Sequence, residues 1–526
     1  MKRFNTTTVC IPSRHYMVNI DERVREIKKL VRAGYYFTIN RARQYGKTTT
    51  LNELKGALLG EYTVISLSFA GITNEGFETE KAFVRAFCRL FKKNAGLYKE
   101  MPEKIREEID GYIRRTEGAL TLDELFITLQ EWCAISDKPL VLLIDEIDSA
   151  ANNQVFLDFL ALLRDGYISR DTDGLPAFQS VILAGVTDVK HMKSKIRNEA
   201  FSRENSPWNV AADFKIDMSL SQDGIKAMLD EYELDHHTGM DTSQIAAQIR
   251  AYTNGYPFLV SRICQLIDEE LLPESWTANG VEEAVKALVN EKNTLFDSLM
   301  GKIRAYPRLR AQIKYLLFRG EAIEYLPDSD AQDQLMMYGF IVNEQNTVSI
   351  ANRIFEMRLC RYFVGESEFA RDMKREALKD KPEFIKGGAL DVPLIMERFI
   401  ESQRIIRDMD NDEAEKKFIE EEGRERFLTF LSPIINGVGT YSIEEQTANQ
   451  GRMDVVIHYN GKRYIIELKI WHGDRYNQKG ERQIMGYLEH FGLSQGYLLS
   501  FNFNKKKKPG LEIVHIGDKT IYEGIV

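Results

Sequence analysis

The chain has 526 residues, of which 44% are hydrophobic and 28% are charged, an ordinary globular balance that suits about three or four domains. The formal net charge of −9 excludes a general binder of polyanions, so contact with nucleic acid needs a local basic patch. The five scattered cysteines form no Cys-x-x-Cys pair, which excludes a zinc site and a disulfide framework. With no apolar run of membrane-spanning length and no signal-peptide core, we expect a cytoplasmic location without membrane contact.

A candidate phosphate-binding loop follows a predicted strand at residues 36–39, which is aromatic and β-branched. Residues 49–58 are predicted to form a helix whose first N–H groups point at phosphates. Lys47 is expected to reach the β- and γ-phosphates of ATP, and the Thr48 hydroxyl is expected to bind Mg²⁺. The predicted nucleotide-binding residues of the loop are Arg43, Gln44, Tyr45, Gly46, Lys47, Thr48 and Thr49.

The loop departs from the pattern Gly-x-x-x-x-Gly-Lys-Ser/Thr at one position, because Arg41 stands where the first glycine is expected. A Cβ atom restricts the backbone there, which leaves the rate of ATP hydrolysis open. The alternative interpretation is a chance Gly-Lys-Thr at the start of a helix.

Two acids follow a second predicted strand, at the edge of the sheet where α/β proteins bind ligands. Residues 139–144 form an apolar run typical of a buried parallel strand, and Asp145 and Glu146 come directly after it. Asp145 is expected in the Mg²⁺ shell, although it also fits a helix cap, and Glu146 is expected to polarise the attacking water. After the strand predicted at 180–184, Thr187 is either a sensor of the γ-phosphate or a turn residue.

Alternating strands and helices predict a parallel α/β sheet in the first part of the chain, and the later segments are mostly helical. Within the helical part, the turn around Gly255 resembles the Gly-x-Pro turn that places a proline, here Pro257, over the nucleotide base in AAA-type and STAND ATPases. It also fits a plain helix-separating turn. The predicted domains are an ATPase core (1–220), a helical lid (221–290), a winged helix (291–365), a charged helical connector (366–411) and a further α/β domain (412–526).

The winged-helix prediction depends on a hairpin at residues 340–350 that follows several helices. Such a module binds either DNA or protein. The acids around it, Glu324, Asp328, Asp330 and Asp333, argue against a surface that faces phosphates.

The turn Asn460-Gly461 lies between two alternating strands and is the strongest hairpin signal in the sequence. A two-residue turn at this point fixes the pairing, so Asp454 is expected directly opposite Glu467, with Cβ atoms about 4.5–5.5 Å apart. Lys469 shares their face, because side chains alternate along a strand.

Opposed carboxylates repel each other unless a cation lies between them, and hard oxygen ligands suit Mg²⁺. We therefore predict a metal site at Asp454 and Glu467, in which Lys469 acts on water or on phosphate. Removal of either acid is then expected to stabilise the metal-free fold. The alternative is an exposed hairpin with charged partners. The run of four lysines at 505–508 is either a solvated loop tip or a phosphate contact.

Asp, followed by Glu-x-Lys on the neighbouring strand, resembles the constellation of the PD-(D/E)XK nucleases, although Met453 replaces the leading proline. Gln483 and Tyr487, four residues apart on a predicted helix, resemble the Q-x-x-x-Y element of these enzymes. Glu425 matches the additional acid that many members carry as a metal ligand.

The whole chain resembles a family of bacterial AAA-like ATPases that are fused to a C-terminal PD-(D/E)XK nuclease-like domain. The passages that carry the resemblance include YYFTINRARQYGKTTTL, PLVLLIDEIDSA, NGYPFLVSR and YIIELKIWHGDRYNQKGERQIMGYL. The resemblance implies ATP and Mg²⁺ as cofactors, and it implies that an arginine at position 41 marks a modified loop rather than a broken one.

Two functions follow as hypotheses. In the first, the state of the nucleotide gates a Mg²⁺-dependent nuclease that acts on nucleic acid, with DNA favoured over RNA. In the second, the protein is a STAND-like regulatory switch whose C-terminal domain binds nucleic acid or a partner without cutting. The oligomeric state stays open, a homo-oligomer through the ATPase domain being one option, and Arg197 and Arg203 are both candidates for an arginine that acts in trans.

Overall fold

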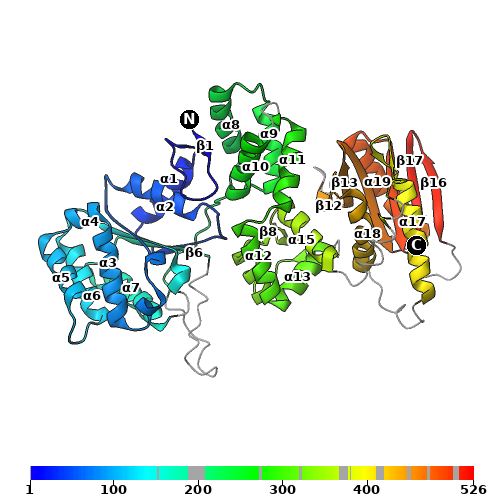
Figure 1. Ribbon diagram of the computed structural model, residues 1–526. Coiled ribbons are helices and arrows are strands. Elements are labelled where there is room, and N and C mark those ends of the chain that lie inside the picture. Colours follow the sequence, from blue (N-terminus) through cyan, green and yellow to red (C-terminus); the bar gives the residue numbers. More distant parts are fainter. Residues whose placement is uncertain are drawn as a thin grey trace. The chain divides into compact units, whose positions relative to one another are not determined.

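The computed structural model describes residues 2–150, 153–186, 208–271, 275–318, 323–366, 377–378, 381–409, 420–436, 438–446, 452–470, 474–501 and 509–526 (Figure 1). The chain folds into two units, each with its own interior. The first unit comprises Met1–Arg250, Gly255–Gln265 and Met337–Gly339, and the second comprises Ala251–Asn254, Leu266–Met336 and Phe340–Val526.

The first unit is built on a parallel sheet with the order β3-β6-β5-β4. Its strands are β3 (Phe37–Asn40), β6 (Ser180–Gly185), β5 (Leu140–Asp145) and β4 (Thr63–Ser68), and the first three lie where the sequence predicted strands. Strand β5 is a continuous apolar run because both faces of the sheet are covered. Val141 and Leu143 pack on one side, and Leu142 and Ile144 pack on the other.

Helices cover both faces of this sheet (Figure 1). One face carries α1 (Asp21–Arg32) and α2 (Lys47–Leu58). The other carries α3 (Glu80–Lys93), α4 (Ala95–Glu100), α5 (Glu103–Arg114), α6 (Leu122–Ile135) and α7 (Gln154–Asp173). The short elements are β1 (Arg3–Phe4), β2 (His15–Tyr16) and the 3₁₀ helices η1 (Phe69–Gly71), η2 (Asn74–Phe77) and η3 (Ile147–Ala150).

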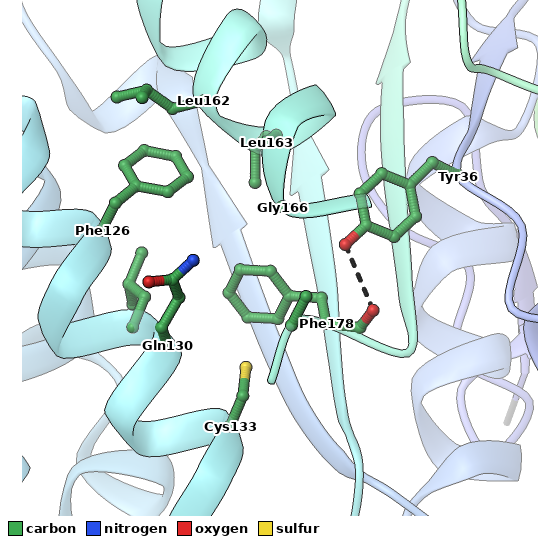
Figure 2. A pocket seen from close by; sticks show the side chains of 10 residues that line it. Tyr36, Phe126, Gln130, Cys133, Leu162, Leu163, Gly166 and Phe178 are labelled. Atoms are coloured by element: carbon green, nitrogen blue, oxygen red, sulfur yellow. Dashed lines mark hydrogen bonds between the residues drawn. The ribbon is translucent and has the colours of Figure 1, made fainter. Parts of the chain in front are cut away.

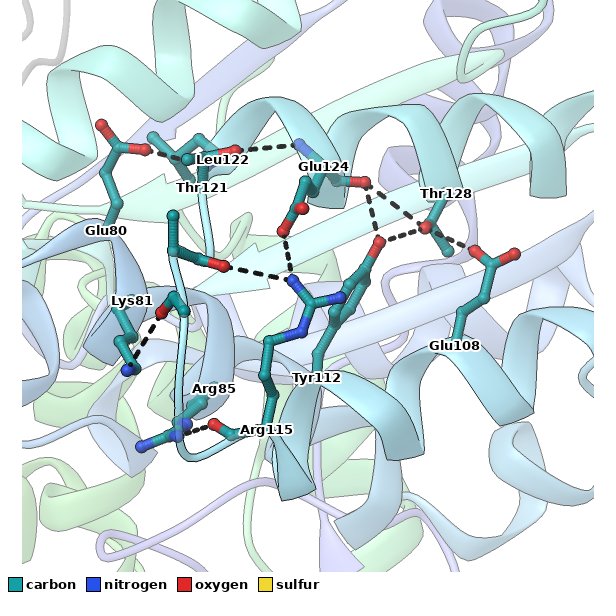
Figure 3. A network of polar contacts seen from close by, with 12 residues as sticks. Glu80, Lys81, Arg85, Glu108, Tyr112, Arg115, Thr121, Leu122, Glu124 and Thr128 are labelled. Atoms are coloured by element: carbon teal, nitrogen blue, oxygen red, sulfur yellow. Dashed lines mark hydrogen bonds and ion pairs between the residues drawn. The ribbon is translucent and has the colours of Figure 1, made fainter.

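A network of hydrogen bonds and an ion pair connects α5 and α6 (Figure 3). The Tyr112 hydroxyl lies 2.8 Å from the Thr128 hydroxyl, which donates to Glu108 at 2.6 Å, and Arg115 pairs with Glu124 at 2.8 Å. Thr121 caps α6 by accepting a hydrogen bond from the Glu124 N–H. The network joins consecutive helices and therefore stabilises this layer.

A small apolar pocket lies beside Tyr36, whose hydroxyl donates to the Phe178 carbonyl oxygen at 3.1 Å (Figure 2). Phe126, Leu162 and Cys133 line it, and burial raises the pKa of the Cys133 thiol to about 12. A thiol that stays protonated is a poor nucleophile, so this pocket is packing rather than a reactive site.

Four helices occupy the segment that was predicted to be helical, residues 221–290. They are α8 (Gln222–His236), α9 (Thr242–Thr253), α10 (Pro257–Glu270) and α11 (Ala278–Asn290). Helix α10 belongs to the first unit up to Gln265 and to the second from Leu266 onward.

The second unit continues with further helices and a small antiparallel sheet of order β7-β9-β8. Its elements are α12 (Thr294–Ala305), α13 (Pro307–Phe318), β7 (Ile323–Glu324), α14 (Asp330–Met337), β8 (Ile341–Glu344), β9 (Thr347–Ile350) and α15 (Arg353–Glu366). The predicted hairpin is confirmed, because Glu344 pairs with Thr347 around Gln345 and Asn346, both at positive φ.

The last part of the chain forms a mixed sheet of order β12-β13-β14-β15-β17-β16. The strands are β12 (Gly439–Gln446), β13 (Arg452–Tyr459), β14 (Lys462–Ile470), β15 (Gln495–Phe501), β16 (Gly510–Ile516) and β17 (Lys519–Ile525). Three helices accompany it, α17 (Val392–Met409), α18 (Glu420–Ile435) and α19 (Asp474–Phe491), with the short pair β10 (Ile385–Lys386) and β11 (Ala389–Leu390) before them.

The expected charged connector at 366–411 is wrong for its second half. Helix α17 packs on β15, β16 and β17, so it belongs to the C-terminal domain. The Leu390 N–H donates to the Tyr464 hydroxyl at 2.9 Å, and the Asn460 amide donates to the Gly388 carbonyl oxygen at 3.0 Å. The charges misled the prediction because they occupy the outer side of an amphipathic helix whose buried residues, such as Ile395 and Phe399, face the sheet.

Helices that are both long enough and apolar enough to cross a membrane do not occur in the described part of the chain.

Candidate nucleotide and metal sites

The predicted phosphate-binding loop joins β3 to α2 at the carboxyl edge of the parallel sheet. Gly46 has φ +78° immediately before Lys47, the first residue of α2, and Gln44 has φ +55°. A residue with a Cβ atom rarely adopts the conformation of Gly46. The loop therefore turns sharply into a helix N-terminus, whose free N–H groups form an anion-binding site.

Lys47 is folded back on its own loop. Its Nζ donates to the carbonyl oxygens of Arg41 at 2.9 Å and Ala42 at 2.8 Å. Burial lowers the pKa of the Lys47 ammonium, while the nearby Asp148 and Glu146 carboxylates act in the opposite direction. A rotation of the Lys47 side chain would be enough to bring its ammonium group from these carbonyl oxygens to phosphate oxygens bound at the loop.

Arg41 does not enter the loop, although it stands where the sequence pattern has glycine. Its guanidinium donates to the carbonyl oxygens of Ile216 at 2.8 Å and Asn40 at 2.7 Å, and it lies 5.3 Å from the centre of the Phe214 ring. Its φ is not in the left-handed region, so the Cβ atom causes no strain. An arginine at position 41 therefore leaves the conformation of the loop unstrained.

Thr48 and Asp145 meet across the sheet. The Thr48 hydroxyl donates to Asp145 Oδ2 at 2.6 Å, and the Glu146 N–H donates to Asp145 Oδ1 at 2.8 Å. Strand β6 lies between β3 and β5, so the two residues reach each other over its carboxyl end. A hydroxyl and a carboxylate placed together are oxygen ligands of the kind that Mg²⁺ takes.

Glu146 is placed beside Lys47 in an unusual backbone conformation, with φ +57°. Burial raises the pKa of its carboxyl group, and the Asp145 carboxylate raises it further. A strained residue with a perturbed acid at the edge of a sheet is a candidate for function.

The turn before α10 brings Pro257, the residue predicted over the nucleotide base, close to Gly46 of the loop. A Cβ atom built on Gly46 would lie 3.8 Å from Pro257 Cγ. Tyr256, which no sequence signal indicated as a site residue, donates from its hydroxyl to the Arg43 carbonyl oxygen, and its ring lies 4.7 Å from that of Tyr45. The Thr49 hydroxyl, by contrast, accepts a hydrogen bond from the Cys10 N–H at 3.2 Å. Thr187, Arg197 and Arg203 lie outside the described residues.

The register of the C-terminal hairpin is as predicted, with Tyr459 paired to Lys462 and Val455 paired to Ile466. Asn460 and Gly461 have φ +49° and +71°, the conformation of a turn that matches the twist of the strands.

Asp454, Glu467 and Lys469 are brought together on one face of the hairpin. Lys469 Nζ lies 2.8 Å from Glu467 Oε1 and 3.7 Å from Asp454 Oδ2, and Asp454 Oδ2 also accepts from the Leu468 N–H at 2.8 Å. Glu467 is fully buried, and its Oε2 atom has no hydrogen-bond partner among the described residues. Burial, and then the charge of Asp454, raise the pKa of Glu467 well above the usual 4.5.

Helix α19 adds the two predicted polar residues to the same face. The Gln483 amide donates to the Tyr487 hydroxyl at 2.8 Å. Burial raises the pKa of Tyr487 to about 12, and the Glu467 and Asp454 charges contribute to this increase. These five residues therefore form one cluster, which matches the predicted constellation.

Two residues of α18 change the predicted ligand set. Glu425, the predicted additional ligand, has its carboxylate paired with Lys314 of α13 at 2.9 Å. No group of three or more His, Cys, Asp or Glu side chains suited to a metal occurs among the described residues. Arg424, which no sequence signal indicated, donates to Asp454 Oδ1 at 2.9 Å from a fully buried position. The set is thus two carboxylates with two cations.

These features define a class of protein, the P-loop ATPases with a parallel α/β core. The chain belongs to the AAA-like domain family, which matches residues 4–363. The matched part ends before the C-terminal sheet. No curated protein matches the chain.

Solved structures with a similar arrangement include the Walker-type ATPase PABY2304 of Pyrococcus abyssi, with 14% identity over 68% of this chain and 99% of that one, at a TM-score of 0.47. Cdc6p from Pyrobaculum aerophilum has 14% identity over 69% and 97% of the two chains, at a TM-score of 0.32. The RuvB branch migration motor of Thermotoga maritima has 12% identity over 63% and 92%, at a TM-score of 0.31.

Proposed function

We propose that the AAA-like core binds ATP with Mg²⁺ and hydrolyses it. The contact between Thr48 and Asp145 at 2.6 Å is the observation that carries this proposal, because it assembles oxygen ligands beside the phosphate-binding loop. When bound, Mg²⁺ neutralises charge that develops on the β- and γ-phosphates. Lys47 would exchange the carbonyl oxygens of Arg41 and Ala42 for charged phosphate oxygens, which form stronger hydrogen bonds.

Glu146 would accept the proton of the attacking water. Burial and the Asp145 carboxylate raise its pKa, which makes it a stronger base, and its position beside Lys47 supports this role. Tyr45 is a residue of the loop whose ring contacts Tyr256, and Pro257 lies near Gly46; both would contact the nucleotide base.

We further propose that the C-terminal domain cuts nucleic acid, DNA in preference to RNA, with Mg²⁺ at Asp454 and Glu467. The buried Oε2 atom of Glu467 supports a cation at this place, since an orphaned carboxylate oxygen is costly without a partner. Mg²⁺ would stabilise charge on the phosphate there. Lys469 would donate to a phosphate oxygen or orient the water, while Gln483 and Tyr487 would hold the substrate on the same face.

The two activities would be coupled, so that the state of the nucleotide gates the nuclease. The segments at 291–365, as a winged helix, would transmit the change. The competing function is a STAND-like switch that binds nucleic acid or a partner without cutting. This alternative retains the ATPase site, but the cluster of Asp454, Glu467 and Lys469 would have no nuclease activity. Lys469 would then only neutralise the two buried acids.

Plasmid cleavage by the full chain tests the proposal, with Mg²⁺ at a fixed free concentration against EDTA, and with ATP, ADP or no nucleotide. We expect Mg²⁺-dependent cleavage that changes with the nucleotide and disappears in Lys469→Met. Lys462→Met, an exposed lysine of the same strand, is the matched control and should cut normally. Tight plasmid binding without cleavage would favour the switch, and cleavage that ignores the nucleotide would leave two unlinked activities.

A further inference from the structure

Arg424 holds one of the two candidate metal ligands and, with the same guanidinium, the end of a helix from another part of the second unit. Its NH2 group donates to Asp454 Oδ1 at 2.9 Å, and its NH1 group donates to the Phe318 carbonyl oxygen at 3.0 Å. Phe318 is the last residue of α13. Arg424 is completely buried, and Asp454 is nearly so. One side chain therefore joins α13 to the cluster.

The positive charges of the cluster already equal or exceed its negative charges without a metal. Asp454 and Glu467 supply at most two negative charges, and Arg424 and Lys469 supply two positive charges at 2.8 to 2.9 Å from them. A divalent ion would add two more positive charges to this group. Cations at such short range repel each other strongly where water is excluded, so the metal and the guanidinium compete for Asp454.

We propose that Arg424 is a lock on the candidate metal site, in which its guanidinium takes the place of a divalent cation on Asp454 until a displacement of α13 withdraws it. The proposal depends on the metal site proposed above for Asp454 and Glu467. In addition, Arg424 blocks metal binding at Asp454 in the metal-free protein, and movement of α13 removes this block.

A second contact supports α13 as the element that controls the lock. Glu425, the next residue on α18, pairs with Lys314 of α13 at 2.9 Å, and its side chain is mostly buried. Two neighbouring residues of α18 are thus bound to α13, one at Lys314 and one at Phe318, a turn apart. A shift of the end of α13 would move both, because packed helices move as rigid bodies.

Calorimetric titration of the nucleotide-free full chain with MnCl₂ tests the lock. We expect Arg424→Met to bind Mn²⁺ at least about tenfold more tightly than the parent, since it removes a repelling charge next to the ion. Arg424→Met/Asp454→Asn should lose this gain, which assigns it to the cluster. Lys314→Met should bind about threefold more tightly, because it loosens α13 without touching the cluster. Arg310 lies on α13, like Lys314, and pairs with Glu366 of α15; Arg310→Met breaks this pair and should match the parent.

Equal or weaker Mn²⁺ binding by folded Arg424→Met would overturn the lock and make Arg424 a support of the site. If Arg424→Met does not fold, as judged by circular dichroism, Lys314→Met decides, and parent-like binding in that variant overturns the role of α13. Tighter Mn²⁺ binding without plasmid cleavage by any variant would uphold the lock and reject the nuclease. Cleavage by the parent together with unchanged Mn²⁺ affinity in Arg424→Met would do the reverse.

Discussion

The Thr48 hydroxyl donates a hydrogen bond of 2.6 Å to the Asp145 carboxylate, although the two residues are 97 positions apart in the chain. They begin a helix and end a strand, respectively, and the parallel sheet brings both to its carboxyl edge. This contact joins the phosphate-binding loop to the acids at the end of β5, so each residue of the site can be tested by a single substitution.

Lys47→Ala should weaken ATP binding at least about 30-fold, because a hydrogen bond to a charged group contributes about 2 kcal/mol. The Lys47 side chain is held by hydrogen bonds to two carbonyl oxygens of its own loop, so the variant should keep its melting temperature within a few degrees. Calorimetric titration with ATP and Mg²⁺ measures the change. Lys55→Ala, on the same helix, is the control and should bind normally; equal affinities of Lys47→Ala and the parent would remove this loop as the nucleotide site.

Glu146→Gln should keep ATP affinity and lose turnover by about 10²–10⁴-fold, because it removes the base and preserves the shape of the side chain. The backbone at Glu146 has φ +57°, which glutamine tolerates as well as glutamate does, so the loop should be unchanged. Phosphate release under saturating ATP is the measurement. Hydrolysis at the parent rate would assign Glu146 a structural role.

Asp454→Asn should lower the melting temperature in EDTA, by an amount that corresponds to about 3–5 kcal/mol, because it leaves the buried Arg424 without its carboxylate. The sequence alone predicted a stabilisation, whereas the contact of Arg424 with Asp454 favours the opposite sign. Calorimetry of both proteins measures the difference. Glu425→Gln, which removes the pair with Lys314, should cost about 1 kcal/mol or less. A higher melting temperature for Asp454→Asn would show that acid repulsion outweighs the pair.

Glu467→Gln should stabilise the metal-free protein, and the stabilisation should grow with pH. The folded state raises the pKa of Glu467 above its value of 4.5 in the unfolded chain, so ionisation favours unfolding. The cost of Glu467 is absent below the unfolded pKa, increases as the pH rises toward the folded pKa and is constant above it. Melting temperatures of variant and parent in EDTA, from pH 5 upward, give the difference. A difference that shrinks with pH would mean that Lys469 stabilises the Glu467 carboxylate more than burial disfavours it.

The sequence by itself determined the features that depend on neighbours along the chain. The Asn460-Gly461 turn specifies its own register, because only a two-residue turn with both φ values positive fits between twisted strands, and this register fixes the shared face of Asp454, Glu467 and Lys469. The loop before α2 and the acids at the end of β5 were predicted for the same reason.

Tertiary structure decided the contacts between segments that no local pattern connects. The helix with Arg424 has an ordinary charged sequence, and only its packing beside α13 and β14 places that guanidinium on Asp454 rather than in solvent. Likewise, the sequence shows Arg41 only as a departure from the glycine pattern. The fold brings the Ile216 carbonyl oxygen within hydrogen-bond distance of its guanidinium, which holds the side chain outside the loop. Buried charges must find partners wherever the fold places them, and those partners lie 30 and 175 residues away.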